Sequence, residues 1–143
     1  MSILVEKMMV TITLDFFIAI AIVESGMHPD AVGDRGKAIG IVQISEICVD
    51  DVNRIYDLDY TYDDRWDIQK SEEIFNLYLK HWGWHYYKTT NKPPSERVMA
   101  RIWNGGPEGW KKPSTIKYWD KVKLHLKGYG SKKDYSGYKR WLR

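Results

Sequence analysis

The chain has 143 residues, a length that favours one folded domain with a substantial hydrophobic core. Hydrophobic residues make up 43% and charged residues 29%, which is typical of a soluble globular protein. The single cysteine, Cys48, excludes an intramolecular disulfide, and the four histidines show no metal-ligand spacing of the HExxH kind. We therefore expect no metal and no cofactor.

The net charge of +3 is spread unevenly along the chain. Residues 117–143 carry nine Lys or Arg against two Asp, a net of +7, which leaves −4 for the remainder. We therefore divide the chain into a domain of residues 1–127 and a basic C-terminal tail of residues 128–143. Such a tail fits an anionic partner, namely a cell-wall polymer, a membrane surface or a nucleic acid, or it serves only solubility.

The amino-terminal segment superficially resembles a signal peptide. Asp15 interrupts the apolar run, no small-x-small cleavage site follows, and cleavage there would remove an expected core helix. We expect that helix to begin at Thr13 or Asp15 and to stop at Gly26. The run is also too short and too interrupted for a membrane span, so we expect neither a signal peptide nor a span.

Glu24 ends that apolar helix, directly before Ser25 and Gly26. A carboxyl group in a poorly solvated position has a raised pKa, because desolvation disfavours its charged form. Glycosidic bond cleavage needs a carboxylic acid that is still protonated near neutral pH. Taken alone, a solvated residue at a helix end is the commoner explanation.

The middle of the chain predicts a loop or irregular hairpin and then two helices. Residues 27–38 contain Pro and Gly and read as the hairpin, and residues 39–45 form a short apolar segment. A helix fits 46–56, with four residues facing inward: Ile47, Val49, Val52 and Ile55. After an acidic, aromatic loop, Asp67 caps a helix that reaches about Trp82.

The last third predicts a loop and two further helices. Residues 83–94 read as the loop, and His81 and His85 are expected in an aromatic patch with neighbouring Trp and Tyr residues. Helices are expected over 95–103 and from Ser114 or Thr115 to about Leu126. The fold class is therefore mainly α, with little or no β-sheet.

Three segments in this order carry a resemblance to a known family: Glu24-Ser25-Gly26, residues 33–44 with Gly40 and Gln43, and residues 100–107 with Trp103-Asn104-Gly105. Together they resemble the lysozyme-like superfamily, in particular soluble lytic transglycosylases and goose-type lysozymes, over residues 15–125. The resemblance implies a lysozyme-like fold, a helical domain with a substrate cleft.

The resemblance also implies roles for individual residues. Glu24 matches the catalytic acid, and Ser25 follows it in the motif. Gln43 matches a cleft glutamine whose amide bonds the sugar N-acetyl group or holds the site, beside Gly40, which would let backbone approach the ligand. Asn104 matches the asparagine of the third segment.

One position departs from the family pattern. The family usually has a tyrosine that helps to position the glutamate, where this chain has Trp103, whose indole can donate but not accept. Trp103 and Tyr118 are candidates for stacking on sugar rings, as are Trp110 and Trp119. The tyrosine's absence motivates an alternative function, a catalytically silent module that binds glycan or serves a virion or cell-envelope assembly.

The implied substrate is the peptidoglycan glycan strand, cut at the β-1,4 bond between N-acetylmuramic acid and N-acetylglucosamine. A hydrolase needs a second carboxylate, for which Asp34 is the first candidate and Asp30 the second. A lytic transglycosylase instead uses the substrate's N-acetyl group and leaves a 1,6-anhydro end. The sequence leaves both outcomes open.

A nucleic-acid binder that uses the basic tail is a third reading, which we do not favour because the tail lies outside the motif-bearing core. The expected place of action is the cell wall, in the periplasm or outside the cell. Without a signal peptide, the expected routes are phage-type release, carriage in a virion or dedicated secretion.

Overall fold

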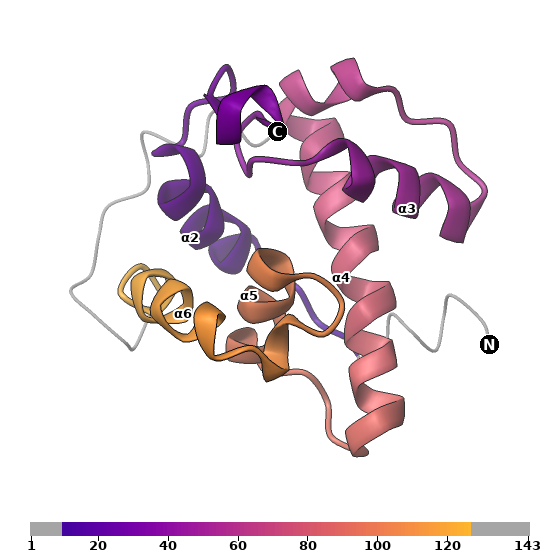
Figure 1. Cartoon of the computed structure of the whole chain (residues 1–143), viewed down its shortest axis with the longest axis vertical. Helices are drawn as coiled ribbons and strands as arrows, with labels where there is room; N and C mark the ends of the chain where they lie inside the picture. Colours follow the sequence, from indigo (N-terminus) through magenta and orange to yellow (C-terminus); the bar gives the residue numbers. More distant parts are fainter. Residues whose placement is uncertain (1–9, 127–143) are drawn as a thin grey trace. The chain divides into compact units, whose positions relative to one another are not determined.

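Figure 1 shows the computed structural model of the chain, which describes residues 10–126. This part holds five α-helices: α2 (Leu14–Ser25), α3 (Glu46–Tyr56), α4 (Ile68–Thr90), α5 (Glu96–Gly105) and α6 (Ile116–Lys123). Its one sheet pairs two short strands, β1 (Val32–Gly33) and β2 (Ala38–Ile39). The predicted mainly α class with little sheet is confirmed, and the basic tail lies outside the described residues.

The chain divides into two compact units. Among the described residues, the first unit consists of 10–19 and 79–126, and the second unit consists of 20–78. Helices α2 and α4 each contribute residues to both units.

Helix α2 begins and ends where the sequence predicts. The Thr13 hydroxyl accepts the Phe16 N–H at 3.1 Å, which caps the helix and confirms Thr13 as the start signal. Every residue from Phe16 to Ala21 is at most 1% exposed, so the helix is buried on all sides. With 12 residues it is short, and no helix within 10–126 combines the length and apolar character needed to cross a bilayer.

The second unit contains the predicted irregular hairpin, which follows the end of α2. Strands β1 and β2 pair antiparallel, with Val32 opposite Ile39 and Gly33 opposite Ala38. Asp34 and Arg35, which connect them, adopt positive φ angles of 48° and 56°. The core of this unit is built from apolar residues of α2 and the turn after it, β2 and the segment that follows, α3 and α4: Ile20, Ala21, Met27, Ile39, Ile41, Val42, Ile44, Val49, Val52, Ile74, Phe75 and Tyr78.

Helix α3 has the predicted bounds, and its buried face matches the prediction at Val49 and Val52 but not at Ile47. Ser45 caps it by accepting the Cys48 N–H at 3.2 Å, and Cys48, Val49 and Val52 are buried. Ile47 was predicted to face inward and is 73% exposed, so that prediction is wrong. The helical period of 3.6 residues places position 47 opposite the stripe formed by 48, 49 and 52.

Helix α4 is longer than predicted. Asp67 caps it as expected, by accepting the Lys70 N–H at 2.7 Å, but the helix continues through Gly83 to Thr90, where a loop was predicted. A side chain at Gly83 would lie 3.1 Å from both Val10 and Pro94, so this glycine permits close packing rather than ending the helix. The predicted aromatic patch is present, with the His81 and Trp82 rings 4.6 Å apart.

In the first unit, α5 packs against α6 (Figure 1). Two short 3₁₀ segments connect the two helices, η3 (Gly109–Lys111) and η4 (Pro113–Thr115). Ser95 caps α5 by accepting the Val98 N–H at 3.2 Å. Thr115 was predicted to cap the last helix, but its buried hydroxyl accepts the Arg101 Nε–H at 2.8 Å and makes no cap bond. The last α-helix also ends at Lys123, earlier than predicted.

Two isoleucines of the second unit test this assignment of the core. Ile74→Ala removes a side chain that is 0% exposed, and we expect it to lower the free energy of unfolding by about 2–5 kcal/mol. Ile47→Ala makes the same chemical change at a 73% exposed position, and we expect a change within about 0.5 kcal/mol. Urea denaturation followed by circular dichroism measures both, and similar losses in the two variants would contradict the described packing of α3.

Candidate active site

Glu24 lies half-buried in the last turn of α2, where the chain reverses sharply. Gly26 and Met27 both adopt left-handed backbone angles, with φ of 64° and 68°. Their N–H groups donate back to the Ile22 carbonyl at 3.0 Å and the Ala21 carbonyl at 3.2 Å. Met27 is 4% exposed, so a buried side chain anchors the turn that follows Glu24.

The hydroxyl of Ser25 is hydrogen-bonded to backbone groups of the protein. Its Oγ lies 2.6 Å from the Ile41 carbonyl and 3.2 Å from the Ala21 carbonyl, and it accepts the His28 N–H at 3.1 Å. The His28 Nδ1 lies 2.8 Å from the Ser25 carbonyl oxygen. Ser25 therefore connects the end of the Glu24 helix to the segment that precedes Gln43.

Gln43 is half-buried and adopts a positive φ of 57°. Its side-chain Nε2 donates to the Gly40 carbonyl at 3.0 Å and to the Ala31 carbonyl at 3.2 Å. The Gln43 N–H also donates to the Gly40 carbonyl, at 3.1 Å, which closes a tight turn over residues 40–43. The sequence places Gln43 beside the site, and the structure shows its amide bound to backbone.

Gly40 is needed at its position for a reason that the sequence does not reveal. It is buried with φ of 87°, and a Cβ there would collide with the carbonyl oxygen of Arg65. The backbone that approaches this glycine most closely is thus the protein's own, where a ligand was expected.

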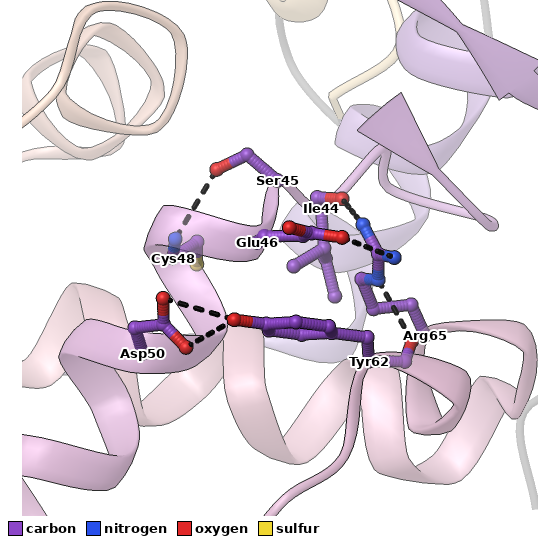
Figure 2. A network of polar contacts seen from close by, with 7 residues as sticks. All are labelled: Ile44, Ser45, Glu46, Cys48, Asp50, Tyr62 and Arg65. Carbon is purple, nitrogen blue, oxygen red and sulfur yellow. Dashed lines mark hydrogen bonds and ion pairs between the residues drawn. The ribbon is translucent and has the colours of Figure 1, made fainter. Parts of the chain in front are cut away.

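Arg65 is the polar centre of this region, and Figure 2 shows its contacts. The side chain belongs to the 3₁₀ segment η2 (Tyr62–Trp66), and the residue is only 7% exposed. Its Nε donates to the Tyr62 carbonyl at 2.7 Å and its Nη1 to the Ile44 carbonyl at 3.1 Å. The Arg65 carbonyl accepts the Ser71 hydroxyl at 3.0 Å, so one residue joins the segment after the turn, η2 and α4.

Three residues of α3 complete the network in Figure 2: the Glu46 and Asp50 side chains contact Arg65 and Tyr62, and the Cys48 N–H donates to the Ser45 hydroxyl. The Tyr62 hydroxyl donates to Asp50 at 2.9 Å, and this hydrogen bond raises the pKa of the tyrosine. Burial, with a smaller effect from Asp51, raises the pKa of the Cys48 thiol well above its ordinary value. Cys48 is therefore a core residue and a poor nucleophile.

The two candidate second carboxylates lie in exposed backbone after the Glu24 helix. Asp34 adopts φ of 48° in the connection between the strands, and its carbonyl accepts the Lys37 N–H at 3.1 Å. Asp30 is also exposed, close to the start of β1. The catalytic role of Asp34 remains a prediction.

The remaining predicted residues belong to the first unit. Trp103 is half-buried and Asn104 is exposed, both in the last turn of α5, and Tyr118 is half-buried on α6. Gly106, with φ of 89°, donates its N–H to the Ile102 carbonyl at 2.8 Å and ends α5. Their contacts with substrate remain predictions, and among residues 10–126 no group of His, Cys, Asp or Glu is arranged to hold a metal ion.

Two glycines with nearly equal φ angles test the packing around the turn. Gly36 has φ of 89° and open space around its Cα, so Gly36→Ala should cost only the left-handed strain of about 1–2 kcal/mol. Gly40→Ala adds the collision with the Arg65 carbonyl, and we expect a further loss of ~1–3 kcal/mol. Thermal and urea unfolding measure the difference, and equal losses would contradict the close approach of Arg65.

Comparison with known proteins supports the family resemblance. Residues 1–125 match the family described as transglycosylase SLT domain. A lysozyme from Magallana gigas is 46% identical over 37 residues, which are 26% of this chain and 27% of that protein. The chain therefore aligns with only about a quarter of this relative's length.

Two solved structures have similar folds. The Tapes japonica lysozyme has a TM-score of 0.67 at 25% identity, covering 85% of this chain and 95% of that one. A chain in the complex of Aeromonas hydrophila PliI with Meretrix lusoria lysozyme has a TM-score of 0.66 at 25% identity, covering 82% and 93%. With a family match over residues 1–125, the chain belongs to the transglycosylase SLT family and has a lysozyme-like fold.

Proposed function

We propose that this protein cleaves peptidoglycan at the β-1,4 bond between N-acetylmuramic acid and N-acetylglucosamine, with Glu24 as the general acid. Membership of the transglycosylase family and similarity to lysozymes support glycosidic bond cleavage. The proposed place of action is the cell wall, and the proposed partner is the glycan strand.

The observation that carries this proposal is how firmly the backbone around Glu24 is held. The residue lies near the end of a helix whose residues 16–21 are fully buried, and Ser25 bonds the Ile41 carbonyl at 2.6 Å. A general acid must be within hydrogen-bond reach of the leaving oxygen. A rigid backbone around the carboxyl group helps to keep it at that distance. Glu24 is also only half-buried, which leaves part of it accessible.

In the proposed reaction, the Glu24 carboxyl group protonates the glycosidic oxygen as the bond to the anomeric carbon breaks. A water molecule activated by Asp34 then attacks that carbon, which gives a reducing end. In the second version, the N-acetyl group assists departure, and Glu24 takes the proton of the muramic 6-hydroxyl as a 1,6-anhydro ring closes. Trp103, Asn104 and Tyr118 are proposed to contact the glycan.

Glu24→Gln tests the general acid. We expect cleavage of purified peptidoglycan to fall about 10²–10⁴-fold, because the amide cannot supply the proton. Glu108→Gln is the matched control, since it makes the same change on the surface of the first unit, at a side chain that is 54% exposed. Mass spectrometry of the released muropeptides measures both variants.

The same spectra separate the chemical outcomes. Muropeptides one water lighter, from the intact protein and not from Glu24→Gln, identify a lytic transglycosylase, and ordinary reducing ends identify a lysozyme. Binding to sacculi without cleavage would reject the enzyme and support the silent glycan-binding module that Trp103 motivates.

Asp34→Asn tests the hydrolytic version. We expect reducing-end products to fall about 10²–10⁴-fold, because an amide cannot activate water as a general base. Asp59→Asn changes another exposed carboxylate of the second unit and should leave the rate unaltered. Loss of activity in Asp30→Asn but not in Asp34→Asn would identify Asp30 as the general base. Full activity in both variants would show that neither carboxylate activates water.

A further inference from the structure

Two polar side chains connect the Glu24 helix to the hairpin that carries Asp34. The Ser25 hydroxyl reaches the Ile41 carbonyl at 2.6 Å, inside the turn of residues 40–43. From the end of the same turn, the Gln43 amide reaches the Ala31 carbonyl at 3.2 Å, directly before β1. The Gly40 N–H also donates to the Ala31 carbonyl, at 2.9 Å, so this oxygen holds both ends of the turn.

The absence of a side chain at Gly33 leaves space for the oxygen of the Gln43 amide. A Cβ at Gly33 would collide with the Gln43 Oε1, so the amide lies directly against the backbone of β1. The Gly33 backbone is extended, with φ of −128° and ψ of 179°, which any residue can adopt. The space taken by Gln43 is therefore the feature that favours glycine here, one residue before Asp34.

The hydrogen-bonding capacity of both side chains is largely used within the protein. The Gln43 Nε2 has two hydrogens, and two backbone carbonyls accept them. The Ser25 hydroxyl has one hydrogen, directed to a carbonyl, and also accepts the His28 N–H at 3.1 Å. A direct donor role toward a sugar would require these bonds to break.

We propose that Ser25 and Gln43 are positioning residues that together form a clasp, which holds the Asp34 hairpin at a set place relative to the end of the Glu24 helix. Where the proposed function holds, this clasp sets the separation of the two carboxyl groups. That separation decides whether a water molecule fits between acid and base, and thus how the product divides between reducing and anhydro ends.

A double-mutant cycle at positions 33 and 43 tests the clasp without relying on activity. Gly33→Ala should displace the Gln43 amide, and Gln43→Ala removes it. Each variant should therefore speed amide hydrogen exchange in peptides from residues 30–41 about tenfold. This loss of protection corresponds to the loss of one or two hydrogen bonds. The double variant should resemble Gln43→Ala alone, because the added methyl group then has nothing to displace.

Controls separate the amide chemistry from simple loss of volume. Gln43→Glu keeps the size of the side chain but replaces its donor group with an acceptor facing two carbonyls, and should exchange as fast as Gln43→Ala. Ser25→Thr keeps the hydroxyl and should preserve exchange rates near those of the intact protein, whereas Ser25→Ala should not. Thermal melts confirm that each variant is folded.

The kinetic readout distinguishes positioning from substrate contact. A positioning role predicts that Gln43→Ala lowers kcat and changes the ratio of anhydro to reducing ends, with KM little altered. A raised KM at unchanged kcat would overturn the proposal and indicate that Gln43 binds the substrate directly.

Unchanged exchange in Gln43→Ala, or additive effects in the cycle, would overturn the clasp whether or not the protein cleaves peptidoglycan. If exchange responds as expected but the intact protein shows no cleavage, the clasp stands as a structural element and the proposed function fails.

Discussion

A buried arginine is the constraint on which the rest of the second unit depends. Removing a guanidinium from water is costly unless its N–H groups find partners, and Arg65 finds the carbonyls of Tyr62 and Ile44. The Glu46 carboxylate lies 3.9 Å from the Arg65 guanidinium and belongs to a 59% exposed side chain, so this ion pair contributes little. Because the Arg65 carbonyl also lies against Gly40, the turn beside the Glu24 helix is held on two sides.

Elements with local signals could be predicted from sequence, and those set by distant contacts could not. Asp67 caps α4 as predicted, and Ser45 and Ser95, for which no cap was predicted, cap α3 and α5 with the same kind of hydroxyl or carboxylate bond. The sequence predicts a loop from residue 83, because sequence alone does not show that Val10 and Pro94 pack against Gly83. Thr115 was read as a cap, because its bond with Arg101 forms only in the folded unit.

The candidate site also has parts that could be predicted from the sequence and parts that could not. The sequence places Glu24 at the end of an apolar helix, as the structure has it, and Gln43 lies at the end of the tight turn, while the roles that the three motifs imply for both residues stay predictions. The partners of their side chains were not predictable, since the Ala31 and Ile41 carbonyls carry no sequence information. Arg65 was missed altogether, because an arginine in an acidic loop ordinarily predicts a solvated charge.

The contact between Gly33 and Gln43 also restricts the order in which this protein can change over evolutionary time. A side chain fits at position 33 without displacing the amide of residue 43 only after that amide has been lost or shortened. The reverse order passes through an intermediate in which two bulky groups compete for one space. Relatives with a larger residue at the first position should therefore also differ at the second, and random libraries that vary one position alone will miss the compatible pairs.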